Sequence, residues 1–184
     1  MKNKKHIVIF VLIVFTLITG RLIYLEEQGN FWEISKNRFY RSAQLDSDEL
    51  EKYIKQYKIR TIINLRGDSN AQWYKDEINI CNKFNINHID LSLSATSEPS
   101  ESKINKLISI LQKASFPILV HCKAGADRSG LATAIWLVTF ENKPYYIAKQ
   151  QLSLIYGHFS IGPTKVMDNY LKKWYEKYKK KDVI

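Results

Sequence analysis

The feature that most constrains this chain is the stretch 121–130, in which Cys122 stands six residues before Arg128. An apolar run at 118–120 precedes it, and a second one at 131–138 follows it. These runs predict a buried strand, a tight loop and a buried helix in direct succession. The loop therefore opens at a helix N-terminus, where unpaired backbone N–H groups and the helix dipole stabilise an anion.

The side chains of this loop suit a nucleophilic phosphate site. The field that holds an anion also favours the thiolate form of Cys122, which is the form that attacks a phosphomonoester. Arg128 supplies a planar fork of donors for two phosphate oxygens. Ser129 is expected to stabilise the sulfur when water cleaves a phosphocysteine. The remaining predicted substrate contacts are the loop positions Lys123, Ala124, Gly125 and Ala126.

Residues 121–129 read His-Cys-x5-Arg-Ser. At these residues the chain resembles the cysteine-dependent protein tyrosine and dual-specificity phosphatase superfamily, and most of all its small bacterial members. The stretches 39–44 and 62–66 also fit that group, so the resemblance spans about residues 31–160. It implies a phosphomonoester hydrolase that needs neither metal nor cofactor and that acts on phosphorylated proteins through a phosphocysteine intermediate.

Strand and helix patterns alternate along the soluble part of the chain. They predict an α/β fold, a three-layer sandwich with a central, largely parallel sheet flanked by helices. Cys122 falls at the carboxyl end of a strand, where ligands bind in such sheets. The predicted strands are 31–35, 38–42, 59–65, 86–91 and 117–121, and the predicted helices begin after Asp46, at Ala71, near Ile104 and at Leu131, with two or three more to the C-terminus.

Expelling the leaving group calls for a general acid, which in most of the superfamily is an aspartate on a separate loop. The corresponding loop here, 92–101, contains no aspartate. Asp127 directly precedes the arginine, as in the similar Gly-x-Asp-Arg loop of myotubularin lipid phosphatases and some broad-specificity bacterial phosphatases. We therefore assign the acid to Asp127, with Glu98 and Asp90 as alternatives.

Several functional alternatives stay open at this point. Lys123 resembles the lysine of inositol-phospholipid phosphatases with a Cys-Lys-Ala-Gly loop, so a phosphoinositide or inositol phosphate is the alternative substrate. A pseudophosphatase that binds phosphate without turnover and a rhodanese-like or arsenate-reductase-like thiol enzyme are further rivals. Arg41 and Arg66 are either rim residues of the site or members of ion pairs, for Arg66 with Asp68 or Glu77.

The N-terminal segment, residues 1–28, is predicted to be a membrane anchor ahead of a phosphatase domain at 29–184. Residues 7–19 are uncharged and almost wholly apolar, and the apolar character continues to Leu25. Lysines before the run and Glu26 after it predict a single-pass anchor with the catalytic domain outside the cytoplasm. The alternative is a cleaved signal and a secreted or periplasmic enzyme.

The formal net charge of +10 favours anionic partners such as phosphorylated substrates. The basic residues near the C-terminus, over 172–181, are interpreted as the solvated face of a helix, so no nucleic-acid partner is expected. Cys81 lies on the apolar face of a predicted helix and is expected to be a core residue. No metal-ligand pattern is visible among His6, His88, His121 and His158, and His121 is expected to order the loop.

Overall fold

Five short strands form one sheet in a computed structural model that describes residues 2–181. The order is β1-β2-β5-β3-β4, with β1 antiparallel to β2 and every other neighbouring pair parallel. The predicted, largely parallel sheet is therefore confirmed. The strands are β1 (Trp32–Ser35), β2 (Phe39–Ser42), β3 (Thr61–Asn64), β4 (Asn87–Asp90) and β5 (Ile118–His121).

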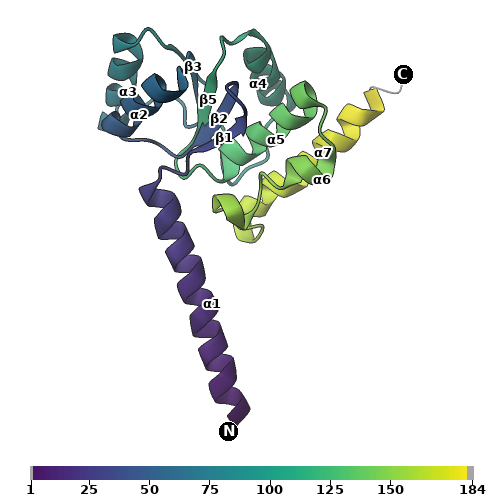
Figure 1. The fold of residues 1–184 in the computed structure, drawn as a ribbon. Helices are drawn as coiled ribbons and strands as arrows, with labels where there is room; N and C mark the ends of the chain where they lie inside the picture. The colour runs from purple at the N-terminus through teal and green to yellow at the C-terminus, as the bar shows by residue number, and fades with distance from the viewer. Residues whose placement is uncertain (1, 182–184) are drawn as a thin grey trace.

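Successive residues of a strand point to opposite faces of the sheet, so each strand feeds two cores. Ile62 and Leu119 pack under α2 (Ser47–Tyr57) and α3 (Gln72–Lys83). Ile63 and Val120 pack under the second helical layer on the other face. Figure 1 shows the sheet between its two helical layers. That layer contains α4 (Glu101–Lys113), α5 (Asp127–Glu141), α6 (Tyr145–Lys149) and α7 (Val166–Lys181), with the 3-10 turns η1 (Leu154–Tyr156) and η2 (Gly162–Lys165) between the last two helices.

Local sequence signals set the ends of several elements, and the start of α2 after Asp46 is as predicted. The side chain of Asp46 caps α2 by accepting from the backbone N–H of Glu49. In return the backbone N–H of Asp46 donates to the side chain of Glu49. Cys81 is 1% exposed within the core under α2 and α3, which confirms its expected burial. Asn142 ends α5 in the left-handed conformation, where a short polar side chain is tolerated.

The register of the parallel strands aligns their carboxyl ends. Ser42 of β2 and Asn64 of β3 both pair with His121 of β5, and Asn64 pairs with Asp90 of β4. The residues that follow these positions therefore lie along one edge of the sheet. Cys122 is the first of them after β5, so the strand pairing itself places it at that edge.

One long helix, α1 (Lys2–Glu27), projects from the sandwich in Figure 1. Among the described residues, Lys4–Glu27 is the one helix long and apolar enough to cross a membrane, and none of its apolar window is buried. Leu25, near its end, is 4% exposed because it packs against the domain. Met1 and residues 182–184, which belong to the predicted anchor and domain, lie outside the described residues.

Candidate active site

Cys122 lies at the base of a loop, residues 122–126, that joins β5 to α5. The side chain is 2% exposed, and its Sγ lies 3.4 Å from the Oγ of Ser129 in the first turn of α5. Ser129 is itself fully buried. The two groups therefore have the arrangement expected from the sequence, with a hydroxyl held against the sulfur.

Arg41 braces this loop from inside the protein. Its Nη2 donates to the carbonyl oxygens of Gly125 and Ala126 at 2.7 and 3.0 Å, and its Nη1 donates to the carbonyl oxygen of Gln151 at 2.9 Å. The side chain is fully buried, and burial lowers its pKa to about 10, so the guanidinium stays charged at neutral pH. Arg41 is thus neither a rim residue nor a member of an ion pair; it fixes the shape of the loop.

The carbonyls of Lys123 and Ala124 are also bonded from outside the loop. The backbone N–H of Gln44 donates to the carbonyl of Lys123 at 3.1 Å, and Nδ2 of Asn30 donates to that of Ala124 at 2.9 Å. Among the described residues, no acceptor contacts the N–H groups of loop positions 123–126. With its carbonyls bonded elsewhere, the loop has these N–H groups left for an anion.

Gly125 is required by both conformation and space. Its φ of +70° lies in the left-handed region. A Cβ built there would lie 2.6 Å from the backbone N of Ala43 and 2.9 Å from Nδ2 of Asn30. The loop therefore rests directly against the chain at the end of β2 and against Asn30, which follows α1.

Arg128 reaches from α5 over the carboxyl ends of β3 and β4. Its Nη1 lies 3.4 Å from the carbonyl oxygen of Leu65 and 3.5 Å from that of Leu93, which is long for a hydrogen bond. Its Nε is buried without a hydrogen-bond partner in the part of the chain that the structure describes. The guanidinium is thus held in place but keeps donors free for a bound anion.

Arg66 lies on the rim beside Arg128. Its guanidinium stacks over the ring of Trp73 at 3.5 Å, and its Nη1 donates to Oε1 of Gln44 at 3.0 Å. Burial and then the positive charge of Arg128 lower the pKa of Arg66. The predicted ion pair with Asp68 or Glu77 is wrong, because no such pair forms among the described residues.

Glu77 forms a buried polar cluster behind the cysteine. Its carboxylate accepts from Nε2 of Gln44 at 2.6 Å and lies 2.7 Å from Nε2 of His88 and 3.2 Å from Nε2 of His121. Burial alone would raise the pKa of Glu77, but its contacts with His121, His88 and Gln44 outweigh burial and lower it. The sequence led us to expect that His121 orders the loop, but its imidazole contacts Glu77 instead.

No set of residues suited to a metal ion occurs within residues 2–181.

Asp127 begins α5 and contacts a residue that the sequence did not single out as functional. Its Oδ1 lies 2.6 Å from Nδ1 of His158, whose Nε2 lies 2.9 Å from Oδ2 of Asp168. Burial alone would lower the pKa of His158, but hydrogen bonds to the two carboxylates outweigh burial and raise it above 6.5. Protonated His158 then donates to both. The available signal was a lone histidine in a segment free of acidic residues, 142–167.

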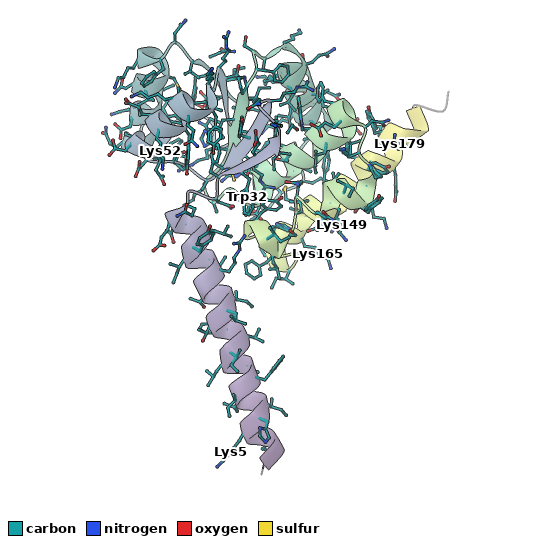
Figure 2. The ribbon with its side chains drawn as sticks, viewed as in Figure 1. Lys5, Trp32, Lys52, Lys149, Lys165 and Lys179 are labelled. Carbon is teal, nitrogen blue, oxygen red and sulfur yellow. The ribbon has the colours of Figure 1, made fainter. Side chains whose placement is uncertain are left out.

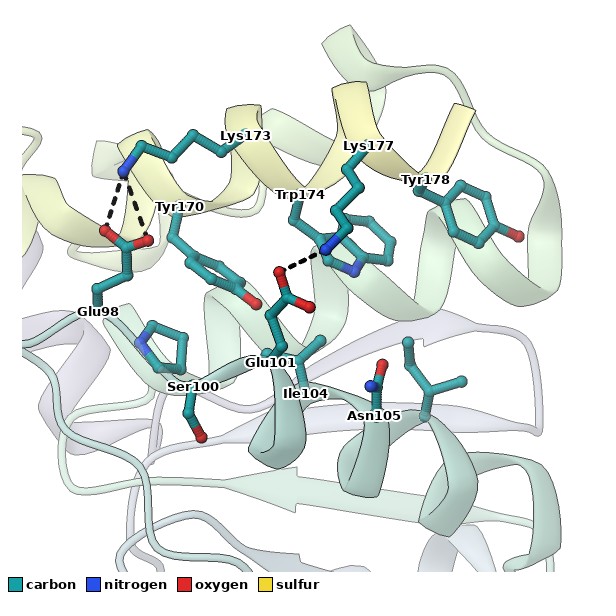
Figure 3. Close-up of a pocket in the computed structure, with 12 residues that line it drawn as sticks. Glu98, Ser100, Glu101, Ile104, Asn105, Tyr170, Lys173, Trp174, Lys177 and Tyr178 are labelled. Atoms are coloured by element: carbon teal, nitrogen blue, oxygen red, sulfur yellow. Dashed lines mark hydrogen bonds and ion pairs between the residues drawn. The ribbon is translucent and has the colours of Figure 1, made fainter. Parts of the chain in front are cut away.

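The two alternative acids are engaged elsewhere. Figure 3 shows Glu98 paired with Lys173 at 3.1 Å, at one end of a groove of about 520 Å³ between α4 and α7. That groove has no lining residue from loop 122–126. Asp90 accepts from the hydroxyl of Tyr74 at 2.6 Å and from Nδ2 of Asn64 at 2.8 Å.

Comparison with known proteins agrees with this architecture. Tyrosine-protein phosphatase cdc-14 of Caenorhabditis elegans is 31% identical over 86 residues, which cover 47% of this chain and only 11% of that protein. P. aeruginosa TpbA superposes with a TM-score of 0.62 at 17% identity, covering 78% of this chain and 84% of TpbA. The core catalytic domain of the PP-IP phosphatase SIW14 from S. cerevisiae gives 0.62 at 19%, covering 82% and 93%.

These two superpositions show a shared fold. The family described as PTP-NADK, "DSP-PTPase phosphatase fused to NAD+ Kinase", matches residues 23–160, which include every strand of the sheet and the loop with Cys122. The resemblance drawn from the sequence is therefore confirmed, and the chain belongs to this family of DSP-PTPase phosphatases.

Proposed function

We propose that this chain is a metal-independent phosphomonoester hydrolase of the tyrosine/dual-specificity type, with Cys122 as its nucleophile. The observation that carries the proposal is the loop at 122–128, where Cys122 lies under backbone N–H groups that lack acceptors and beside the free donors of Arg128. A solved complex of TpbA contains pTyr, which supports phosphotyrosine as a substrate.

The reaction proceeds in two displacements. Sγ of Cys122 attacks phosphorus, the bond from phosphorus to the leaving oxygen breaks, and that oxygen takes a proton. Water then attacks phosphorus and the P–S bond breaks; the proton lost by the water returns to Asp127 and His158, while the hydroxyl of Ser129 stabilises the departing thiolate. In both steps Arg128 and the loop N–H groups hold the non-bridging oxygens, whose charge grows in the transition state.

The proton comes from the pair of Asp127 and His158. Protonated His158 lies 2.6 Å from the carboxylate of Asp127 and is placed to supply it with a proton. The proton on Nδ1 of His158 moves to Asp127, and Asp127 in turn protonates the leaving oxygen. Asp168 holds the far side of the imidazole in place. His158 is thus a positioning residue and proton source, while Asp127 contacts the reacting atoms.

A phosphoinositide or inositol phosphate is the second candidate substrate. Arg66 lies close enough to Arg128 for their charges to interact, and Lys123 is exposed on the loop. These cations favour a ligand with a second phosphate near the one under attack. The likeness to SIW14, described as a PP-IP phosphatase, supports this candidate.

The N-terminal helix serves as an uncleaved single-pass anchor in this proposal, with the catalytic domain outside the cytoplasm. Lysines precede the apolar run and Glu26 follows it, which fits that orientation. The contact of Leu25 with the domain supports an anchor that is retained, because a cleaved signal would need no such packing. A reporter that works only outside the cytoplasm should be active when it is fused after Ile184. Activity of a reporter that works only in the cytoplasm would reverse the assignment.

The deciding experiment compares a phosphotyrosine peptide, a phosphothreonine peptide and a phosphoinositide side by side, without metal, using the full chain. Wild type should hydrolyse at least one of them, and vanadate should inhibit it. Cys122→Ser should lose about 10⁴-fold or more in rate while it still binds a phosphate analogue. Binding without turnover by the wild type would favour the pseudophosphatase.

A further inference from the structure

We infer that the segment around η1 and η2 is a second membrane contact, which sits in the bilayer surface beside α1 and holds the catalytic loop at that surface. The first observation is where the apolar side chains are exposed. Outside α1, the exposed large apolar side chains among the described residues all fall within 146–161. They are Tyr146, Leu154, Ile155 and Ile161, with exposed fractions of 68, 56, 55 and 71%.

These side chains are not scattered singly along the segment. Leu154, Ile155 and Ile161 line one shallow apolar depression together with Phe159. Soluble domains rarely leave such a group uncovered without a partner. A partner with an apolar interior is therefore expected at this surface.

The depression is joined to the end of α1. Nη2 of Arg21 donates to the carbonyl oxygen of Ile155 at 2.6 Å, which fixes η1 level with Arg21 along the helix. A Cβ at Gly157 would lie 3.4 Å from Cδ1 of Leu25 and 3.7 Å from Cδ2 of Leu22. The segment and the last turns of α1 are thus one continuous surface.

The length of α1 places Arg21, and with it η1, at the edge of the hydrocarbon layer. The uncharged run 7–20 is about 21 Å long at 1.5 Å per residue, which is shorter than the ~30 Å hydrocarbon layer. A membrane crossed by α1 therefore extends to or past Arg21, toward Leu22 and Ile23. Ile155, at the same level, then meets the bilayer boundary.

The charges around the depression suit the same partner. The segment 142–167 contains no acidic residue but has Lys143, Lys149 and Lys165. Figure 2 shows Lys149 and Lys165 on the side of the domain from which α1 projects. Apolar side chains between lysines are the pattern of a surface that enters a bilayer with anionic headgroups.

The catalytic loop is directly behind this surface. Nδ2 of Asn30 donates to the carbonyl oxygens of both Ala124 and Tyr156 at 2.9 Å, and a Cβ at Gly157 would lie 4.0 Å from Cβ of Ala126. A seated segment 154–161 therefore fixes the distance of Cys122 from the membrane. The inference rests on the proposed anchor and does not depend on turnover.

The test measures depth in the bilayer by fluorescence quenching. The full chain with Cys81→Ser and Cys122→Ser receives a single dye-labelled cysteine, and is reconstituted in phosphatidylcholine and phosphatidylglycerol vesicles with nitroxide-labelled lipid. Ile155→Cys and Ile161→Cys report on the segment. Leu12→Cys reports on α1, and Lys36→Cys, exposed at the opposite end of β2, is the matched control.

Labels at Ile155 and Ile161 should lose most of their fluorescence when the nitroxide lies near the headgroups. The Leu12 label should be quenched best by a nitroxide deep in the chain, and the Lys36 label should remain bright. Labels at both segment positions as bright as the one at Lys36 would overturn the inference, and so would an unquenched Leu12 label. Because the reporters lack Cys122, the result is separate from any failure of the proposed phosphatase activity.

Discussion

Nη2 of Arg41 donates a 2.7 Å hydrogen bond to the carbonyl oxygen of Gly125, so a fully buried cation on β2 sets the conformation of the loop that holds Cys122. Arg41→Lys keeps the charge but cannot reproduce the fork that bonds two loop carbonyls and Gln151 together. We expect kcat to fall about 10²-fold from the displaced loop. Steady-state kinetics would measure this, with exposed Arg60→Lys as the control; a normal rate in Arg41→Lys would show that the brace is dispensable.

Gly125→Ala should lower both stability and activity. Any Ala at this φ costs about 1–2 kcal/mol in backbone strain, and here the Cβ would also collide with the backbone of Ala43. Gly162→Ala is the matched control, because its φ is +60° and nothing lies within 4 Å of its Cβ position. Denaturant unfolding should show only the strain cost in Gly162→Ala, with full activity. Equal losses in the two variants would mean that loop contact is unimportant.

The loop chemistry could be predicted from the sequence because it depends on residues close together in the chain, whereas the order of the strands in the sheet depends on pairing between distant segments and was not predicted. Cys122, Arg128 and Ser129 are fixed in relation to one another by one strand, one turn and one helix start. The individual strands followed from short apolar runs such as the one that contains Ile62 and Ile63, which face opposite helical layers.

The residues that hold the loop in place could not be predicted, because their roles depend on contacts with residues distant in sequence. Arg41 reaches Gln151, 110 residues away, and His158 reaches Asp127, 31 residues away. Glu77 on α3 was considered as a possible partner of Arg66, yet its carboxylate is buried and contacts His88 and His121 from two strands. Periodicity assigns a face to such residues but not a partner.

Asp127→Asn should slow the hydrolysis of alkyl phosphates by about 10²-fold or more, the usual contribution of a general acid. An activated aryl phosphate should be affected far less, because its leaving group departs without a proton. His158→Gln should show the same dependence on the leaving group, more weakly, since it removes the proton source and leaves the carboxyl in place. The ratio of the two losses is the measurement.

Glu98→Gln and Asp90→Asn are the controls for this assignment, since both side chains are engaged away from Asp127. Their losses should not depend on the leaving group. A leaving-group effect confined to Glu98→Gln would move the acid to the separate loop and leave Asp127 with the task of shaping the cradle.

The folded protein should lose stability with rising pH through His158. Its folded pKa lies above the ordinary 6.5, so the group binds its proton more tightly in the folded than in the unfolded chain. The stabilisation is complete below about pH 6.5 and disappears as pH rises through the raised folded value. Urea unfolding from mildly acidic to mildly alkaline pH would measure it. Asp168→Asn should flatten the dependence, whereas exposed Asp48→Asn should not; an unchanged slope in Asp168→Asn would refute the coupling.

Glu77→Gln should destabilise the fold by about 3 kcal/mol, the lower end of the cost of breaking a buried charge pair. The pKa of Glu77 is lowered in the folded protein, so its stabilisation is present above its ordinary pKa of 4.5 and disappears as the pH falls toward the lowered value. Chemical denaturation at neutral pH would test the loss, with Glu51→Gln on the surface of α2 as the control. Equal stability of the two variants would contradict a charged role for Glu77.

The most direct test of the phosphatase mechanism is to trap the phosphocysteine. Wild-type protein is mixed with a phosphopeptide that it hydrolyses, quenched rapidly in acid and digested. One peptide of the enzyme, the one containing Cys122, should be heavier by one phosphoryl group. Cys81→Ser, which changes the other cysteine, should yield the same adduct. Turnover by the wild type with no adduct at Cys122 under any quench time, or an adduct that persists in Cys122→Ser, would contradict nucleophilic catalysis by this residue.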